Sequence, residues 1–196
     1  MSWLEHYELR GEHVALEPLR EEHVPALQTA VRDGQLWQLW YATVPAPEAV
    51  PQYVAQAIAG SQRGDLAYAV RELKTGRIVG TTRYYDVTPQ HRRALLGYTW
   101  YARSVQGSAV NAESKFLLLR HFFDQHQGLA IEFRTHFFNH NSRRAIEKLG
   151  AKQDGILRSH QIMADGSIRD TVVYSILDSE WQAVRNGLLH RLTATQ

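Results

Sequence analysis

The sequence predicts a mixed α/β fold whose front half is an antiparallel sheet. Strand-like and helix-like segments follow the order strand, two helices, three strands, helix, strand, helix, two strands, helix. Two pairs of consecutive strands are joined by short turn sequences, which favour antiparallel hairpins. Helices separate most of the other strands, which favours helical layers packed on the sheet.

The first third of the chain predicts one strand, two helices and a loop. Residues 13–19 alternate apolar and polar side chains, as a half-buried strand does. Residues 21–32 place three apolar side chains on one helical face and stop at an Asp-Gly pair. Residues 47–63 repeat such a face, with prolines only near the start, where a helix tolerates them. Residues 35–46 carry aromatic side chains without a period and are predicted to form a loop.

The middle of the chain predicts three strands and the strongest helix. Residues 66–72 and 77–86 are strand-like and are joined by a Leu-Lys-Thr-Gly turn. Residues 94–101 follow as a further strand. Residues 111–127 are predicted to be helical, and Gly128 marks the end of that helix.

The last third predicts a strand, a helix, a hairpin and a final helix. Residues 131–137 form the strand, and residues 139–149 form a helix that ends at a glycine. Residues 151–163 and 169–177 flank an Asp-Gly pair that favours a tight hairpin turn. A Ser-x-x-Gln spacing at residues 179–182 matches a capping box and opens the last amphipathic helix.

Composition predicts one globular domain, residues 1–196. Hydrophobic residues make up 44% and charged residues 21% of the 196 residues, which is ordinary globular usage and excludes disorder. Lys and Arg number 22 against 20 acidic residues and form no basic stripe, so direct binding of nucleic acid is not expected. The absence of cysteine excludes disulfides, thiolate metal sites and a cysteine nucleophile.

The sequence carries no membrane or export signal that we recognise. Residues 1–9 include charged side chains and lack the apolar stretch of a signal peptide. The apolar runs are far shorter than the about 18 residues needed to cross a bilayer. A soluble cytoplasmic protein is therefore expected, with no membrane partner.

Residues 100–113 form the first segment with chemical potential. A strand ends there, a loop of small residues follows, and a long helix begins. Such a junction directs backbone N–H groups and the positive end of a helix at one point, which suits a phosphate. The alternative is a tight turn in which Asn111 caps the helix and binds nothing.

Residues 135–150 form the second segment and again run from strand through a polar junction into a helix. Asn139 and Ser142 are three residues apart, as an N-cap and its first turn are. Capping alone is therefore one explanation of these two residues.

Both segments resemble the signatures of the GCN5-related N-acetyltransferase (GNAT) family. Gln-Gly-Ser-Ala-Val-Asn at residues 106–111, followed by Glu113 and Lys115, resembles the acetyl-CoA loop of that family. The pattern Asn139-x-x-Ser142-x-x-Ala-Ile-x-Lys-Leu-Gly resembles its second signature. The RimJ/RimL-like subgroup, which includes N-terminal acetyltransferases of ribosomal proteins, is the most similar, and the resemblance covers nearly the whole chain.

The resemblance implies a mostly antiparallel central sheet with helices on both faces, and acetyl-CoA as the cofactor. The end of the strand at residues 94–101 would offer a backbone N–H to the thioester carbonyl, and Asn139 would bind the pantetheine arm. The implied cofactor-binding residues are Trp100, Tyr101, Ala102, Arg103, Gln106, Gly107, Ser108, Ala109, Val110, Asn111, Asn139 and Ser142.

The sequence departs from the family at several positions. Ala109 and Asn111 stand where the family loop has a glycine and a second small residue, and Ala109 serves only if its φ is not positive. Ile146 occupies the position of the frequent general-acid tyrosine. Ser142 matches a serine that the resemblance implies to be the acid, with a purely structural place in the helix start as the alternative.

The strand after the second signature presents Ser-His-Gln where the subgroup can have a carboxylate, so His160 is the candidate base. A structural histidine is the alternative, and the reaction can proceed without a strong base. An α-amino group has a pKa about 2.5 units below that of lysine, so its neutral form costs roughly 3.4 kcal/mol less to reach.

The ten histidines do not predict a metal site. His136 and His140 straddle a predicted strand end and helix start, and His121 and His126, five apart on a helix, should point in different directions. No carboxylate completes either pair, so no metal ligand is predicted.

Aromatic residues gather in the first half of the chain. Most should belong to the core, but Trp37 and Trp40 lie in the predicted loop and are candidates for the wall of an acceptor site.

Together these features predict an acetyl-CoA-dependent N-acetyltransferase acting on a primary amine, either a peptide or protein N-terminus or a small amine. The alternative is a catalytically silent acyl-CoA-binding sensor or interaction module, which Ile146 keeps open. The acceptor is not identified by the sequence, and a homodimer is compatible with it.

Overall fold

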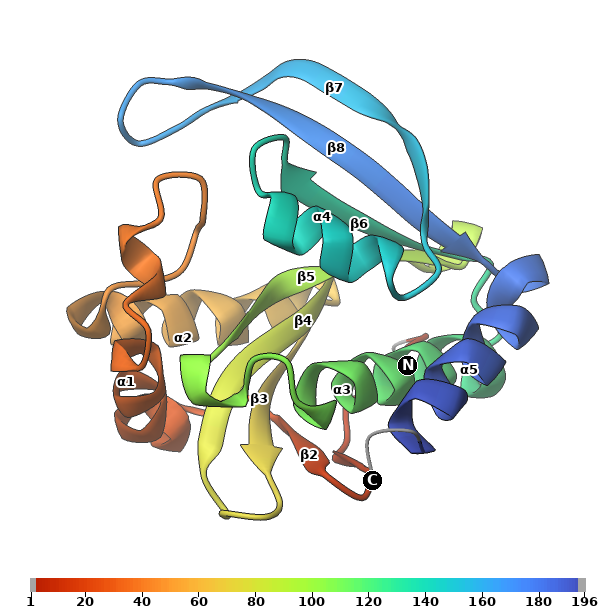
Figure 1. The fold of residues 1–196 in the computed structure, drawn as a ribbon, viewed down its shortest axis with the longest axis horizontal. Helices are drawn as coiled ribbons and strands as arrows, with labels where there is room; N and C mark the ends of the chain where they lie inside the picture. The colour runs from red at the N-terminus through yellow and green to blue at the C-terminus, as the bar shows by residue number, and fades with distance from the viewer. Residues whose placement is uncertain (1–2, 194–196) are drawn as a thin grey trace.

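The strands of the described chain, residues 3–193, form one sheet in the order β1-β2-β3-β4-β5-β6-β8-β7 (Figure 1). In this computed structural model the ends of the predicted domain, residues 1–2 and 194–196, lie outside the described residues. Every neighbouring pair is antiparallel except β5 and β6, which are parallel. The strands are β1 Leu9–Arg10, β2 Val14–Pro18, β3 Leu66–Glu72, β4 Ile78–Thr88, β5 Arg93–Tyr101, β6 Ala130–His136, β7 Lys152–Ile162 and β8 Ile168–Leu177.

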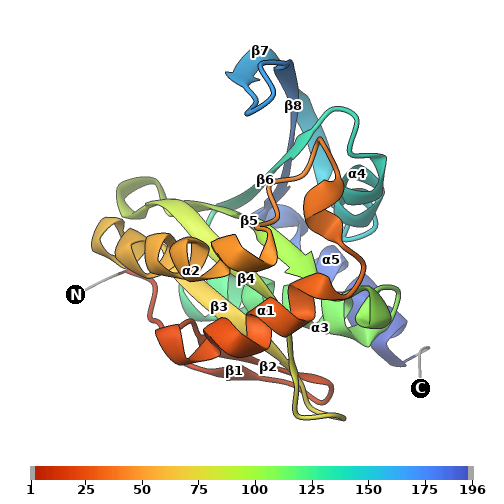
Figure 2. The same ribbon diagram turned by 90° about the vertical axis from the view of Figure 1, so that its left-hand side faces the viewer.

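The helices cover both faces of this sheet, so the predicted mixed, mostly antiparallel fold is confirmed. Helices α1 and α2 lie on one face of the β2–β5 half and α3 lies on the other, while α5 packs against α3 and β8 (Figure 2). Helix α4 packs beside β6. Among the described residues, none of the helices combines the length and the apolar character that crossing a bilayer requires. The helices are α1 Val24–Arg32, α2 Val50–Ala59, α3 Ala109–Arg120, α4 His140–Glu147 and α5 Asp178–Thr193.

Two helices begin earlier than predicted. Helix α3 starts at Ala109, because Ser108 is the N-cap and its hydroxyl accepts the N–H of Val110. Asn111 is therefore inside the helix and is not its cap. Helix α5 starts at Asp178, ahead of the predicted serine cap, and the Glu180 carboxylate accepts the N–H of Leu177 at 3.1 Å.

The end of α3 corrects the predicted placement of His121 and His126. The helix continues into a π-helical turn, His121–Gln125, whose hydrogen bonds join residues five apart. The two imidazoles therefore meet, with their Nε2 atoms 3.2 Å apart. The prediction that they diverge was wrong because it assumed the α-helical period. Burial, with a further effect from His126, lowers the pKa of His121 to about 4, so that side chain is neutral at physiological pH.

A buried carboxylate fixes the N-terminal half of α3 to the turn between β1 and β2, at one edge of the sheet. Glu113 accepts backbone N–H groups from Glu12, His13 and Val14 at 2.8, 2.7 and 2.7 Å. The preceding Gly11 is required by this contact, because a Cβ there would lie 2.6 Å from both carboxylate oxygens. The β1–β2 turn and the N-terminal half of α3 are thus held as one unit.

We expect Glu113→Gln to lower the free energy of unfolding by about 2–3 kcal/mol, because the amide turns an NH₂ group toward donors that a carboxylate satisfies. Urea unfolding at neutral pH measures the change. The exposed Glu48→Gln is the matched control. Gly11→Ala should also lower the free energy of unfolding, because it disturbs the same contact. The loss in the double variant should therefore be smaller than the sum of the two single losses. An unchanged unfolding midpoint for Glu113→Gln would show that the carboxylate is not an anchor.

Candidate functional site

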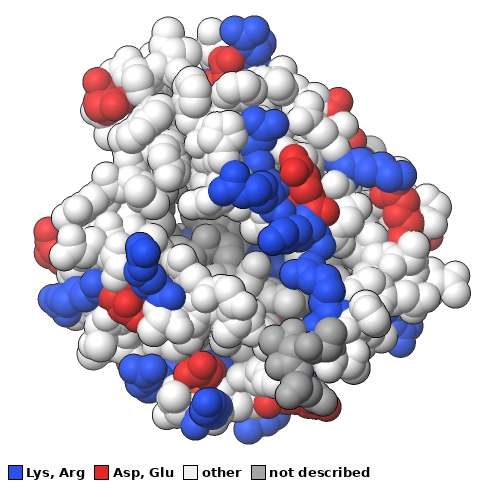
Figure 3. Space-filling model, viewed as in Figure 1, with Lys and Arg blue, Asp and Glu red and all other residues white. Residues whose placement is uncertain are grey.

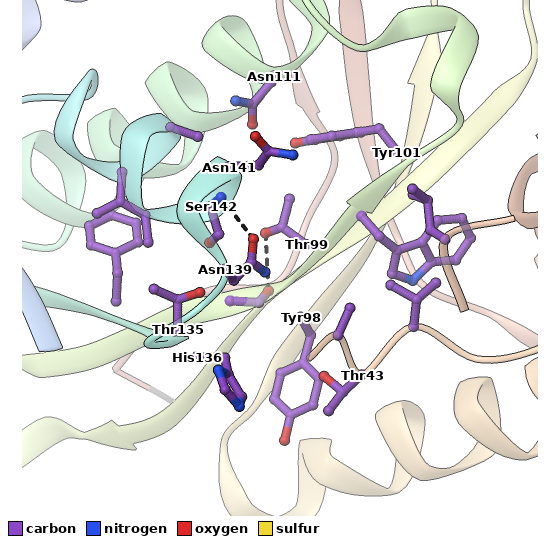
Figure 4. A pocket seen from close by; sticks show the side chains of 18 of the residues that line it. Thr43, Tyr98, Thr99, Tyr101, Asn111, Thr135, His136, Asn139, Asn141 and Ser142 are labelled. Atoms are coloured by element: carbon purple, nitrogen blue, oxygen red, sulfur yellow. Dashed lines mark hydrogen bonds between the residues drawn. The ribbon is translucent and has the colours of Figure 1, made fainter. Parts of the chain in front are cut away.

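A pocket of about 480 Å³ opens where β5 and β6 part. These parallel strands pair only through Arg93, Ala94 and Leu95 with residues 130–132. Farther along, β5 and β6 line opposite walls, and α3, α4 and the loop at residues 36–44 complete them (Figure 4). The pocket therefore lies at the C-terminal ends of the two strands, between the halves of the sheet.

A β-bulge in β5 shapes the floor of this pocket. The register with β4 shifts between the pairs Thr81–Trp100 and Arg83–Gly97, and Tyr98 has a φ of +49°. The Tyr98 carbonyl accepts hydrogen bonds from the hydroxyls of Thr81 at 3.2 Å and Tyr53 at 3.3 Å. A bulge leaves an extra residue outside the ladder and turns its side chain. Tyr98 is accordingly 45% exposed and lines the pocket rather than the core.

The first predicted segment builds one end of the pocket. Five of its ten predicted ligands line the cavity: Trp100, Tyr101, Gln106, Gly107 and Asn111. The other five form the loop and helix start beside it: Ala102, Arg103, Ser108, Ala109 and Val110.

The backbone of this loop suits close approach by a ligand. Gly107 has a φ of +80°, and its Cβ position has no atom within 4 Å. Ala109 is the first residue of α3 and does not have a positive φ. It therefore meets the condition under which an alanine can replace the glycine of the family loop.

The second predicted segment forms the facing wall. Asn139 is the N-cap of α4, and its Oδ1 accepts the N–H of Ser142 at 3.0 Å. Asn139 and Ser142 also line the pocket, so capping and a place at the site are not alternatives for Asn139. Ile146 continues the same wall as an apolar side chain.

Lys115 is a pocket residue whose role sequence reasoning missed. It follows Asn111 by one helical turn, and its Nζ donates to the hydroxyls of Thr82 at 3.0 Å and Thr99 at 2.6 Å. Among the ion pairs of residues 3–193, none involves Lys115. Burial lowers the pKa of the Lys115 ammonium to about 7. The one sequence signal was a lysine beside the apolar run Phe-Leu-Leu-Leu.

Several other buried polar atoms border the pocket. The hydroxyl of Tyr101, the Nε1 of Trp100 and the Nε2 of His136 make no hydrogen bond of normal geometry with the described residues. All three residues line the cavity. Buried polar groups are usually satisfied, so these atoms mark a place where a polar ligand would bind.

Trp37 and Trp40, the predicted aromatic wall of the acceptor site, are not among the described lining residues, but the adjacent Tyr41 is. Tyr41 lines the pocket, whereas Trp37 packs against the core. The Trp40 ring lies 5.1 Å from the His136 ring and 5.7 Å from the Phe138 ring. Trp40 therefore holds the loop against the end of β6 instead of facing the cavity.

The predicted base, His160, lies on β7 and is not among the described residues that line the cavity. Its Nδ1 is 3.0 Å from the hydroxyl of Thr171, which also accepts the Nε–H of Arg169 at 2.9 Å. Arg169 lines the pocket, and His160 is thus one hydroxyl removed from a lining residue. Within the described residues, His, Asp and Glu side chains form no group of three that would hold a metal ion.

The family model and similar solved structures describe acetyltransferases. A family model described as an acetyltransferase (GNAT) domain matches residues 13–152. No curated protein matches the sequence. An assigned acetyltransferase of T. thermophilus is 33% identical, with a TM-score of 0.84 over 97% of this chain and 99% of that chain.

Two further solved structures share the architecture. A GCN5-related N-acetyltransferase from Brucella melitensis is 25% identical, with a TM-score of 0.86 over 98% of this chain and 90% of that chain. RimJ of Mycobacterium smegmatis in complex with CoA-disulfide is 22% identical, with a TM-score of 0.76 over 94% of this chain and 91% of that chain. At this identity the likeness to RimJ is one of fold.

We expect Lys115→Met to stabilise the protein at pH 7 by on the order of 4 kcal/mol, because the fold no longer desolvates an ammonium group. The pKa of Lys115 is lowered from 10.5 to about 7, so the folded state holds its proton less tightly than the unfolded state. The penalty is complete below pH 7 and disappears as pH rises toward 10.5.

Denaturant unfolding of both proteins at pH 6, 7, 8 and 9 measures this difference. The advantage of the Met variant should shrink steadily above pH 7, whereas the exposed control Lys74→Met should show no such trend. A Met variant that is less stable at every pH would mean that the two threonine hydroxyls fully compensate the buried charge.

Proposed function

The chain belongs to the GNAT acetyltransferase family, and from this premise we propose that it transfers an acetyl group from acetyl-coenzyme A to the α-amine of a peptide, a protein or a small molecule. The observation that carries the proposal is the pocket between β5 and β6. It runs from Asn111 at the start of α3 to Tyr98 and His136, so a cofactor and an acceptor can meet within one cavity (Figure 4).

The α3 end of the pocket fits the phosphates of coenzyme A. Within the described residues, the N–H groups of Gln106 and Ser108 donate to the carbonyls of Arg103 and Val105, so the donors for a phosphate come from Gly107 and from the first turn of α3, at the positive end of that helix. Lys and Arg side chains gather over α4, beside the hollow of the same face (Figure 3). The presence of coenzyme A as a disulfide in the structurally similar RimJ of Mycobacterium smegmatis supports this assignment.

Acetyl-coenzyme A supplies the thioester, and the middle of the pocket provides polar groups for its arm. The Oδ1 of Asn139 is used by the helix cap, which leaves the Nδ2 group as a donor to a pantetheine carbonyl. The bulge at Tyr98 leaves backbone N–H groups of β5 available to the thioester carbonyl. Membership of the RimJ/RimL-like subgroup would account for both assignments and is part of the proposal.

Proton transfer has two candidate donors in opposite walls. Ser142, in the first turn of α4, is proposed as the acid that protonates the departing thiolate. Lys115 contributes positive charge from the α3 side, and its pKa of about 7 lets it exchange protons at neutral pH. His160 stays a candidate base, although its link to the pocket passes through Thr171.

We predict that Asn139→Asp separates capping from cofactor binding. Aspartate caps a helix as well as asparagine does, so the melting temperature should stay close to that of the wild type. The variant lacks the NH₂ donor, so the dissociation constant of coenzyme A should rise about tenfold, which corresponds to about 1.4 kcal/mol. Isothermal titration calorimetry measures the affinity.

Asn139→Ala should lose both stability and affinity, whereas Ser142→Ala should lower kcat and leave coenzyme A affinity unchanged. Wild-type affinity in Asn139→Asp would reduce Asn139 to a helix cap. Equal losses of stability with unchanged kinetics in both alanine variants would show that Asn139 and Ser142 serve only the start of helix α4.

We also predict faster acetylation of an α-amine than of a lysine side chain at pH 7. The walls hold no Asp or Glu side chain among the described lining residues, so no carboxylate base lies in the lining and an amine that is already partly neutral is favoured. At pH 7 roughly 10% of an α-amine is neutral, against less than about 0.1% of lysine. The assay compares a peptide with a free N-terminus and no lysine with an N-blocked peptide that carries lysine.

A faster reaction of the blocked lysine peptide would contradict this preference and require a base that we have not identified. Binding of coenzyme A without acetylation of any member of a broad amine panel would favour the catalytically silent module.

A further inference from the structure

The lining of the pocket is positively charged. Among the described lining residues, three are Lys or Arg and none is Asp or Glu. The three cations are Lys115, Arg134 and Arg169, and His136 lies among them. A pocket that receives an ordinary cationic amine, such as a polyamine, would be expected to carry carboxylates.

The three cations differ in how their charge is balanced. Arg134 forms an ion pair with Glu132 at 2.5 Å. Lys115 is held by two hydroxyls and can lose its proton. Arg169 donates its Nε–H to the hydroxyl of Thr171, and none of the ion pairs of residues 3–193 neutralises it. The neighbouring carboxylate, Asp170, is occupied by Arg158 at 2.5 Å.

Arg169 is placed at the acceptor end of the pocket. Burial lowers the pKa of the His136 imidazole, and the nearby Arg169 lowers it further against an opposite effect of Asp170. Tyr85 and Tyr98 are the other electrostatic neighbours of Arg169. Tyr98 and His136 lie at the end of the cavity away from Asn111 (Figure 4). Burial lowers the pKa of Arg169, yet a guanidinium stays protonated in proteins, so a partly desolvated charge faces the place of the acceptor.

A second uncompensated cation lies beneath the same ring. The Cζ of Arg83 is 4.0 Å from the centre of the Tyr98 ring and 5.4 Å from that of Tyr53. Arg83 is buried, and its Nε makes no hydrogen bond with the described residues. Two arginines that form no ion pair with a carboxylate of residues 3–193 therefore flank Tyr98, with Arg83 inside the sheet and Arg169 at the cavity wall.

We propose that the acetyl acceptor carries a carboxylate close to its amine and that Arg169 binds this carboxylate. The inference rests on the proposed acetyl transfer and names the chemical class of its acceptor. A guanidinium offers parallel N–H donors that match both oxygens of a carboxylate, and a partly buried arginine makes this pair strong. The carboxylate belongs either to a free amino acid or to an acidic side chain next to a peptide N-terminus.

The experiment measures kcat/KM for two matched pairs of acceptors. Leucine against leucinamide, compared per neutral amine, tests an α-carboxylate. Ser-Asp-Leu-amide against Ser-Asn-Leu-amide tests a side-chain carboxylate at almost constant amine pKa. We expect the carboxylate member of one pair to react at least about tenfold more efficiently, which is the scale of one charge-assisted interaction.

Arg169→Gln should abolish this preference by raising KM for the carboxylate acceptor, while the neutral acceptor changes less than about threefold. Arg169→Lys keeps the charge without the paired donors and should retain part of the preference. Coenzyme A affinity should be unchanged in both variants. The exposed Arg10→Gln, on the far edge of the sheet, is the matched control and should keep the wild-type preference.

Equal efficiency within both pairs, or an equal loss for charged and neutral acceptors in Arg169→Gln, would overturn the carboxylate assignment and leave the acetyl transfer standing. A failure to acetylate any of the four acceptors or a broader amine panel would overturn the proposed function, and this inference with it.

Discussion

The early parting of β5 and β6 is the constraint on which the rest of the site depends. These parallel strands share only three paired positions, so most of the facing backbone has no neighbouring strand. Such an opening in the middle of a sheet would expose unpaired backbone groups and the core unless other elements enclosed it. Helix α3 supports it from one side and α4 from the other, and the loop at residues 36–44 closes the remaining wall. The Glu113 anchor matters for this reason: it fixes the N-terminal half of α3, where the opening needs its support.

The groups around this opening are costly for the fold. Three such groups lie in or beside the pocket: the neutralisable Lys115, the buried Arg83, and the hydroxyl of Tyr101. Within residues 3–193, the Nε of Arg83 and the Tyr101 hydroxyl have no hydrogen-bond partner of normal geometry. An apolar side chain at any of these positions would avoid the desolvation of a polar group. Their concentration at one cavity, against a core of Leu, Val, Ile and aromatic side chains, fits polar groups that contribute to binding rather than to stability.

Most of the fold could be predicted because periodicity and turn sequences are local. The alternating strands, the two hairpins and both helix entrances were correct within a few residues. The two-residue strand β1 and the π-helical turn were missed, since neither has a sequence period. The two polar junctions could be found from their resemblance to family signatures. Lys115, Arg83 and Arg169 could not be assigned, because a lysine or arginine in a helix or strand ordinarily predicts a solvated side chain.

The lack of Asp and Glu among the described lining residues and the positive charge of that lining belong to one electrostatic arrangement. Positive side chains near the acceptor disfavour its ammonium form, so they lower the pKa of the amine and make a dedicated base less necessary. The same charges favour the thiolate that departs when the amide forms, because that group carries negative charge. A neutral amine has no charge by which the pocket can hold it. A carboxylate on the acceptor would instead be attracted by the positive side chains of the lining. In the arrangement that we propose, the amine would enter neutral, the acceptor would be held by its anionic group, and the negative charge that develops on sulfur would meet Lys115 and Ser142, which line other walls of the pocket.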